Sequence, residues 1–488
     1  MRSPFMRRFV SPLLAGSLLL IAGCGGGGEP AEYHPQIEEA ERRLGAEQHP
    51  VLLAEFGGAY QGPEAAYVAR IGEGIAQAAE LGGECTFTLV NTDVVNAFAV
   101  PGCYIYVTRG LMGLVNSEAE LASVLAHELG HIVADHSSRQ QNRSILRELG
   151  VIAVGLVTGS DRLTRLAGQA AQYFTLRYSR TQEYESDDLG IRYMKAAGYD
   201  PYEAADMLGA LGRQERFVAG TDGDNAKAIP EWARTHPLTE NRIERARQTA
   251  AKTGVADNAL PEKIGPFLDE VDGLLYGDDP EQGFVLGRRF AHPVMRISFE
   301  APAGFTLTNS PQAILLAGPD GVRGEFGGGT LPAGGLGAYV EALLGQMLGG
   351  SQAEIGAPEQ RRINGLPALV VPVLVRTEQG DAQIHVAAYA TGGDAAYHFI
   401  MVSSGSGNDA AIGRLIGSFR LLTPAEAQSL RPRQIRVVAA GPGDNVQSLA
   451  RRMASDHPLD HFLMLNGRSA DQPLRPGERV KIVTFAGG

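Results

Sequence analysis

Apolar side chains recur at helical spacing over residues 117–136, and this stretch gives the clearest structural prediction in the chain. Ser117 is a preferred N-cap residue, and Glu120 three positions later completes a capping box. The apolar positions behind this cap follow at intervals of three or four residues: Leu121, Leu125, Leu129 and Ile132. The pattern predicts a helix that buries one face in a core.

The same reasoning separates helical from strand-forming regions before residue 250. Helical periodicity predicts three further helices, one over 64–81, one that ends at Gly198 and one over 202–217. Runs of β-branched and aromatic residues predict two strands, 85–90 and 104–107, joined by a tight connection. These elements together predict a mainly α-helical domain with a small β-sheet.

Residues 287–425 alternate between strand-like and helical runs. The predicted strands are 296–300, 305–308, 313–317, 324–327, 368–376, 382–390 and 397–403, and the predicted helices are 336–348 and 410–418. Antiparallel strands with a helix after the fourth one predict an α+β domain. The order of elements is similar to the PsbP/Mog1-like fold, and we expect an accessory or partner-binding role for it.

Residues 433–486 have the pattern of a small βααβ unit. The run from Gly443 to Ala450 resembles the first strand-to-helix turn of a LysM module. The runs 463–467 and 474–482 resemble its second helix and closing strand. Such modules commonly bind N-acetylglucosamine polymers, so the resemblance implies contact with peptidoglycan. The alternative is a degenerate copy that serves only as a packing domain.

The N-terminal residues have the pattern of a lipoprotein export signal. Three arginines precede an apolar run over residues 9–22, and Cys24 follows in a lipobox-like sequence. We expect residues 1–23 to be removed, Cys24 to be lipidated, and residues 24–47 to form a tether and a helix. Gly25 after the cysteine is typical of sorting to the outer membrane. An ordinary signal peptide or a short membrane anchor is the alternative.

The predicted organisation places the helical domain at 48–252, a connector at 253–286, and the α+β and LysM-like domains after it. The formal net charge is −12, and loss of the three signal-peptide arginines brings it to −15. This balance argues against a general nucleic-acid binder. Cys85 is the first residue of the strand predicted at 85–90, and Cys103 directly precedes the strand predicted at 104–107. In an oxidising compartment such a pair favours a disulfide, with two free buried thiols as the alternative.

The helix at 117–136 contains the motif His127-Glu128-x-x-His131. At about 100° per residue the two histidines lie about 40° apart, so both imidazoles can bind one ion. Glu128 lies at the edge of that face, where it can act on water as a general base. The alternative is a set of polar side chains that only solvate the helix surface. His136 falls on the opposite face, which indicates a structural role.

A third metal ligand is available on the helix that ends at Gly198. Glu183 and Asp187 are four residues apart and therefore share a face. Two histidines and a glutamate are a known catalytic zinc set, and a second carboxylate can accept the free N–H of a ligand histidine. The alternative is an ordinary acidic helix face.

These motifs together resemble the zinc metallopeptidase family that contains the CAAX prenyl protease, the membrane heat-shock protease and the periplasmic β-barrel assembly-enhancing protease. The resemblance covers about residues 48–250, and Ser186 stands where the family usually has alanine. The matching runs, in chain order, are 96–111, 127–131, 179–187 and 235–237. The resemblance implies a gluzincin fold with one Zn²⁺ per chain, bound by His127, His131 and Glu183.

The resemblance also assigns roles outside the metal ligands. It implies that an edge strand holds the substrate as an added β-strand, with a plain hairpin loop as the alternative; its residues are Asn96, Ala97, Phe98 and Ala99. His236 would either stabilise the oxyanion or occupy the fourth zinc position as a reversible lock. A histidine without a catalytic role is the alternative. Arg242 would orient the substrate or Glu183.

The sequence therefore predicts a lipid-anchored, zinc-dependent endopeptidase on the periplasmic side of the bacterial cell envelope. By resemblance, its substrates would be unfolded or misassembled proteins, including outer-membrane proteins. Two other classes of protein remain open. One is a non-proteolytic chaperone or assembly factor whose zinc is locked by His236, and the other is a cell-wall-binding lipoprotein.

Overall fold

The computed structural model describes residues 36–137, 177–221, 231–238, 240–348, 353–377, 380–404 and 406–487. The export signal, the lipidation at Cys24 and the glycine tether lie outside these residues. Among the described helices, we find none that combines the length and the apolar character needed to cross a bilayer.

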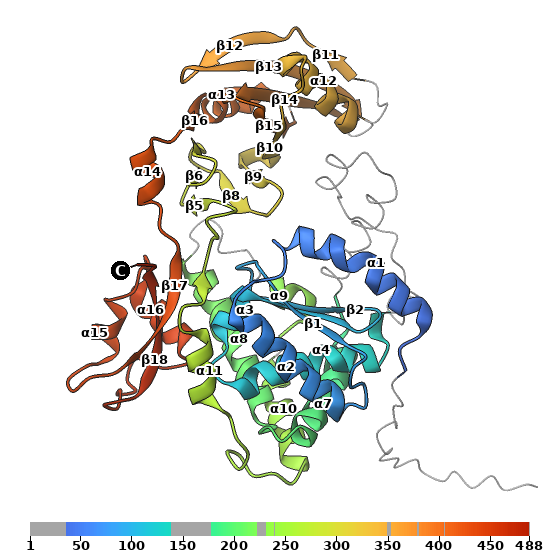
Figure 1. Ribbon diagram of the computed structural model, residues 1–488, viewed down its shortest axis with the longest axis vertical. Helices are drawn as coiled ribbons and strands as arrows, with labels where there is room; N and C mark the ends of the chain where they lie inside the picture. The colour runs from blue at the N-terminus through green and yellow to red at the C-terminus, as the bar shows by residue number, and fades with distance from the viewer. Residues whose placement is uncertain are drawn as a thin grey trace, which may run out of the picture. The chain divides into compact units, whose positions relative to one another are not determined.

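A three-stranded sheet and a set of helices around it form the first part of the described chain (Figure 1). Strand β3 lies in the middle, parallel to β1 and antiparallel to β2. The strands are β1 (Thr86–Val90), β2 (Ala97–Val100) and β3 (Tyr104–Thr108). The helices are α1 (Glu39–Glu55), α2 (Pro63–Ala78), α3 (Arg109–Leu114), α4 (Glu118–Val133), α7 (Arg180–Ala196), α8 (Glu203–Thr221), α9 (Glu231–Thr235) and α10 (Glu240–Lys252).

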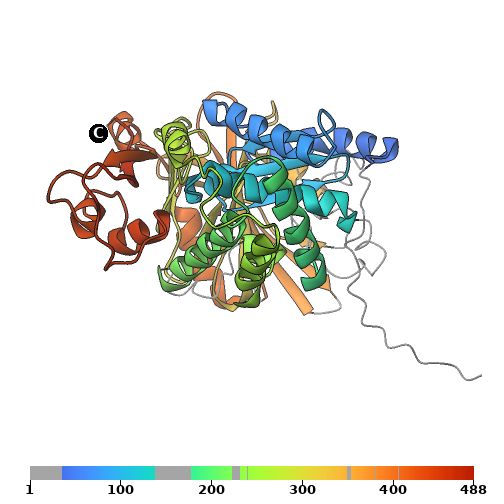
Figure 2. The same ribbon diagram turned by 90° about the horizontal axis from the view of Figure 1, so that it is seen from below.

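Helix α4 lies at the centre of this part. Residues 118–131 are all buried, and the helix contacts α2, α7 and α8. Figure 2 shows the blue to green helices of this part gathered together. Ser117 caps its N-terminus by accepting a hydrogen bond from the Glu120 N–H. The Glu120 carboxylate accepts from the Asn116 N–H instead of closing a capping box. A helix buried on every side explains why its polar residues must find partners within the protein.

The sequence pattern continues to residue 136, but α4 ends at Val133. Asp135 adopts φ 49°, a left-handed conformation that ends the helix and redirects the chain. His136 consequently returns to the helix terminus and approaches His131, so its position on the opposite face of a continuous helix was predicted wrongly. The error arose because the apolar period in the sequence continues about one turn beyond the residue at which the helix ends.

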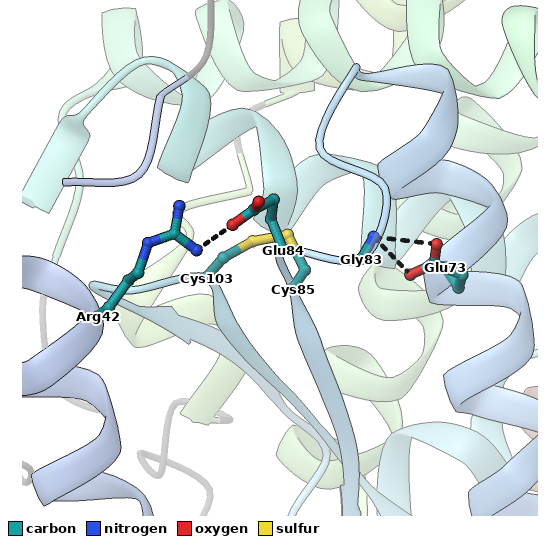
Figure 3. Close-up of a disulfide and its surroundings, with 6 residues drawn as sticks. All are labelled: Arg42, Glu73, Gly83, Glu84, Cys85 and Cys103. Atoms are coloured by element: carbon teal, nitrogen blue, oxygen red, sulfur yellow. Dashed lines mark hydrogen bonds and ion pairs between the residues drawn. A yellow bond between two sulfur atoms is a disulfide. The ribbon is translucent and has the colours of Figure 1, made fainter. Parts of the chain in front are cut away.

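A disulfide joins Cys85 and Cys103 at the start of the two parallel strands (Figure 3). The residues that follow them, Thr86 and Tyr104, are partners in the β1–β3 register, which brings the two cysteines together. Beside the bridge, an Arg42–Glu84 ion pair links α1 to the turn before β1. The bridge therefore fastens the same end of both strands.

Replacing both cysteines by serine is expected to lower the free energy of unfolding by about 3 kcal/mol, the value for a loop of this length. Denaturant titration of the variant and of the wild type measures the difference. Reduction of the wild type should cause the same loss, and reduction of the variant should cause none. Two labelled thiols in denatured, unreduced wild type would contradict the disulfide.

The described part of residues 284–421 contains two further sheets and two α-helices. The larger sheet has the order β11-β13-β14-β15-β10-β9-β8, with β12 added to β13, and the smaller has the order β16-β7-β6-β5. Apolar residues of α12 and α13 pack on two core clusters of this region. The strands are β5 (Phe284–Leu286), β6 (Arg289–His292), β7 (Ile297–Glu300), β8 (Thr306–Asn309), β9 (Ile314–Ala317), β10 (Arg323–Thr330), β11 (Ala353–Ile355), β12 (Glu359–Ile363), β13 (Leu366–Thr377), β14 (Gly380–Ala390), β15 (Ala395–Ser403) and β16 (Arg420–Leu421), and the helices are α12 (Gly335–Leu348) and α13 (Asp409–Ser418).

A βααβ unit follows a short helix, α14 (Pro424–Ser429). Its elements are β17 (Arg433–Ala439), α15 (Val446–Ala450), α16 (Pro458–Leu465) and β18 (Arg479–Phe485). Strand β17 pairs with β18 on one side and with β4 (Leu275–Tyr276) on the other. The order of elements agrees with the predicted βααβ pattern, and the LysM resemblance itself stays a prediction.

The segment predicted as a connector contributes to the core of the helical domain. It contains helix α11 (Ile264–Val271), whose Phe267 and Leu268 are buried in the same cluster as α2 and α4 residues. Ile435 of β17 belongs to that cluster too. The C-terminal unit is therefore packed into the domain that carries α4.

One buried lysine strengthens this contact. The ammonium of Lys481, on β18, donates to the carbonyls of Gly113, Leu114 and Val115 at 2.8, 3.1 and 2.7 Å. These carbonyls end α3 and precede the N-cap of α4. Lys481 thus holds the backbone from which the central helix begins, because the last carbonyls of a helix lack intrahelical donors.

Candidate metal centre

Helix α4 brings His127, Glu128 and His131 into the interior of the domain. All three residues are at most 6% exposed. The Nε2 atoms of the two histidines lie 3.0 Å apart, so both imidazoles point to one place. The separation of four residues on one helix produces this convergence.

Helix α7 brings Glu183 to the same place. Ser179 caps α7 in a capping box with Gln182, which fixes where the helix begins. Glu183 is 1% exposed, and its carboxylate oxygens lie 3.6 Å from Nε2 of His127 and from Nε2 of His131. The three residues expected to hold zinc are therefore gathered by two helices that cross.

Small residues allow these helices to approach closely. A Cβ added at Gly130 would lie 2.7 Å from Oγ of Ser186, and one added at Gly190 would lie 3.1 Å from the His127 backbone nitrogen. Ser186 donates a hydrogen bond from its hydroxyl to the His127 carbonyl. Ser186, in place of the family's usual alanine, thus fits between α4 and α7 and adds a hydrogen bond between the two helices.

His236 completes a group of four. It follows α9, and its ring stacks on Trp232 with the centroids 4.4 Å apart. Its Nδ1 lies 3.3 Å from His127 Nε2 and 3.1 Å from Glu183 Oε1. One ligand atom from each of His127, His131, Glu183 and His236 can be chosen so that all lie within 4.8 Å of one another.

This donor set fits zinc. Imidazole nitrogens and a carboxylate oxygen are its usual ligands, and three or four of them surround the ion tetrahedrally. Buried neutral imidazoles are required for binding, and burial together with neighbouring histidines holds the pKa of His131 well below its ordinary value. A buried carboxylate in this position is otherwise unfavourable, so the cluster is suited to a cation.

Asp187 and Arg242 surround the ligands. Asp187 Oδ1 lies 2.9 Å from Nδ1 of His127, as expected for a carboxylate that orients a ligand histidine. Arg242, on α10, donates to both oxygens of Asp187 at 2.8 Å and lies 2.6 Å from Glu183. Arg242 is 1% exposed, so its charge is fully committed to these two carboxylates.

The charges around the cluster lower the pKa values of Glu183 and Asp187, a direction that suits metal binding. Burial would raise the pKa of Glu183, but Arg242 and His236 lower it below its ordinary value. Burial would also raise the pKa of Asp187, but the neighbouring Arg242 guanidinium lowers it below its ordinary value. Both groups therefore stay ionised, one as a ligand and the other as a partner of His127.

Glu128 is set apart from the ligands. Neither of its oxygens has a hydrogen-bond partner among the described residues, although both are buried. Burial is the largest cause that raises its pKa, partly offset by His236 and His127. His236 Nε2 lies 3.5 Å from Oε1. A carboxylate beside a metal site that makes no hydrogen bond to the described protein is suited to taking a proton from a water molecule.

Strand β2 forms the edge of the sheet beside α4. Within the described chain it pairs with β3 alone, so its other backbone edge has no strand partner there. All four residues of β2 are buried. The Asn96 side chain, just before β2, is buried and without a partner among the described residues. Sequence patterning predicted a connection here, because four residues are too few to show a strand period.

The site also contains residues that were not predicted from the sequence as part of it. His136 approaches His131 and Glu185, and Tyr178 stacks on the His131 ring at 3.8 Å between centroids. The only sequence signal for Tyr178 was its place just before the Ser179 cap. His136 was visible as a third histidine near the motif, but the position at which α4 ends decides where it points.

Comparison with known proteins agrees with this geometry. Residues 63–250 match the model of Peptidase family M48. The β-barrel assembly-enhancing protease of Yersinia pestis is 34% identical over 173 residues, which cover 34% of this chain and 34% of that protein. The mitochondrial metalloendopeptidase OMA1 of Arabidopsis thaliana is 32% identical over 173 residues, 35% of this chain and 32% of that protein. The chain thus spans about a third of the length of these curated relatives.

A solved structure also aligns with part of the chain. The cyanobacterial PsbP of Synechocystis sp. PCC 6803 covers 28% of this chain and 98% of its own, with 15% identity and a TM-score of 0.23. That score is too low to carry an argument, so the PsbP/Mog1-like fold remains a prediction from the sequence. The family match and the buried His-Glu cluster together settle the identity of the helical domain. The residues that match Peptidase family M48, 63–250, thus form a zinc metallopeptidase domain within the chain.

Proposed function

We propose that the whole protein is a zinc endopeptidase of the bacterial cell envelope that cleaves unfolded or misassembled proteins, outer-membrane proteins among them. The observation that carries the proposal is the buried cluster of His127, His131, Glu183 and His236 with Glu128 beside it. The name of the Yersinia relative, a β-barrel assembly-enhancing protease, supports the substrate class. Lipidation at Cys24 would anchor the protein on the periplasmic side of the outer membrane.

The residues of the chain divide the reaction between them. When bound by His127, His131 and Glu183, zinc supplies Lewis-acid polarisation of the scissile carbonyl and favours water as a nucleophile near neutral pH. Glu128 takes the proton from the attacking water and passes it to the leaving amine. Asp187 and Arg242 hold His127 and Glu183 in place.

The proposed substrate lies along β2. An extended peptide that adds to the edge of β2 would be held by backbone hydrogen bonds, which do not depend on its side chains. A folded protein does not offer such a free strand, whereas an unfolded chain does. Edge pairing therefore favours unfolded substrates with little sequence preference.

Purified protein is expected to contain one zinc per chain, and His127→Ala or Glu183→Ala is expected to lose it, since two remaining ligands rarely hold a catalytic metal. Elemental analysis of protein dialysed without chelator measures the zinc. Asp188→Ala is the matched control, because Asp188 neighbours Asp187 but pairs with Arg245. Full zinc occupancy in both ligand variants would refute the assignment.

A second candidate is a non-proteolytic assembly factor with a locked zinc site. The position of His236 within the ligand cluster favours it, since a fourth protein ligand leaves no open position for substrate. Degradation of an unfolded protein, with and without chelator, separates the two functions. The LysM-like unit would add contact with peptidoglycan, which retention of full-length protein on purified sacculi tests.

A further inference from the structure

The metal ligand His131 is linked to a second histidine outside the ligand cluster. His131 Nδ1 lies 2.8 Å from His136 Nδ1, and His136 Nε2 lies 3.0 Å from Glu185 Oε2. His136 is completely buried, whereas the Glu185 side chain keeps 25% of its exposure. The three side chains form a continuous line from the metal centre toward solvent.

The direction of each hydrogen bond follows from the orientation of His131. Its Nε2 faces the cluster, 3.0 Å from His127 Nε2 and 3.6 Å from Glu183 Oε1. An imidazole that binds a metal through Nε2 keeps its proton on Nδ1. His131 therefore donates from Nδ1 to Nδ1 of His136. A neutral His136 then has its one proton on Nε2, from which it donates to the Glu185 carboxylate.

The surrounding fold keeps this arrangement in place. Asp135, at φ 49°, turns the chain after α4 so that His136 faces back to the helix. Gln182 donates from Nε2 to the His136 carbonyl at 3.3 Å. Tyr178 covers the His131 ring at an interplanar angle of 21°. Elements on both sides thus restrict rotation of the two imidazoles.

We propose that His136 is a positioning residue for the metal, which together with Glu185 fixes the tautomer and the ring orientation of His131. The inference rests on the proposed zinc ligands. His136 supplies a hydrogen-bond acceptor to Nδ1 of His131. Asp187 supplies one directly to Nδ1 of His127, with its Oδ1 2.9 Å away. Each imidazole ligand is thereby connected to a carboxylate of α7, one through a direct contact and one through an intervening histidine.

Zinc affinity of the full chain tests the proposal, measured by competition with a chromogenic chelator at fixed pH. All variants carry Glu128→Gln so that no chain is cleaved during the measurement. His136→Phe keeps a ring but removes the acceptor, and it is expected to raise the Kd for zinc by roughly 10–100-fold, the usual loss for an outer partner of a ligand histidine. His136→Asn keeps an acceptor near the Nδ1 position and is expected to bind zinc nearly as well as the parent chain.

His398→Phe provides the matched control. His398 is also a buried histidine with a hydrogen bond, to the Tyr339 hydroxyl, but it belongs to the larger sheet of residues 284–421. Its replacement should leave the Kd for zinc unchanged. Visible absorption of cobalt(II) in the same chains gives a second readout, because a reoriented His131 changes the bands without any activity being measured.

The outcomes separate this inference from the proposed function. A folded His136→Phe chain that binds zinc as tightly as its parent would overturn the inference alone. Should that variant fail to fold, Glu185→Ala decides: weaker zinc binding supports the positioning role, and unchanged binding overturns it. A parent chain without zinc affinity would overturn the proposed function and the inference together.

Discussion

Replacing Glu128 by glutamine is expected to reduce cleavage of an unfolded protein by roughly 10²–10⁴-fold, the range for loss of a positioned acid–base group. Glutamine has nearly the shape of glutamate but cannot accept the proton of water. The side chain is buried, and its oxygens have no hydrogen-bond partner among the described residues, so the substitution breaks no hydrogen bond there. Stability and zinc content should therefore stay unchanged.

The measurement is the initial rate of degradation of an unfolded substrate, alongside thermal unfolding and zinc analysis of the same sample. Glu244→Gln is the control, because Glu244 is an exposed residue of α10 that bonds only to Gln248 among the described residues. A Glu128→Gln chain that is folded, contains zinc and cleaves at the parent rate would remove Glu128 from the mechanism.

The variant His236→Ala is expected to cleave faster than the parent chain. His236 lies within 3.3 Å of both His127 and Glu183, in the position of a fourth ligand. Its removal would open that position to substrate and water. If His236 instead donates to the oxyanion, the same change would slow cleavage by roughly 10²–10³-fold. The geometry within the ligand cluster is the reason we favour the lock.

Degradation kinetics on one unfolded substrate decide between these roles. The double variant Glu128→Gln/His236→Ala shows whether faster cleavage comes from this site, since it should be inactive. Slower cleavage by His236→Ala would exclude the lock, and an unchanged rate would exclude both roles. Autolysis, followed by the mass of the purified chain, is a second sign of an opened site.

The parts of the site that could be predicted are those set by local spacing. Two histidines four residues apart must share a helix face, and the same holds for Glu183 and Asp187. Helix α4, with its Ser117 cap, follows from the apolar period for the same reason. These features depend on short stretches of chain, which a single sequence shows directly.

The parts that could not be predicted depend on contacts between distant residues. The bidentate contact of Arg242 with Asp187 joins α10 to α7, and no periodicity encodes that pairing. Helix α11 was taken for a connector, because its eight residues carry too little pattern to show that they enter a core. His136 was misplaced since one left-handed residue, Asp135, decides where the helix ends.

The contact between Lys481 and the end of α3 has a consequence for incomplete chains. The donor lies 368 residues after Gly113. A polypeptide that stops after His236 but before Lys481 therefore lacks the donor for the three carbonyls that precede the metal helix. A polypeptide that stops before β17 also lacks Ile435 in the core of the helical domain. Truncated products of stalled synthesis would therefore contain every ligand residue yet lack the support on which the helix begins. The backbone from which the metal helix begins is thereby fully supported only in a chain that extends to Lys481.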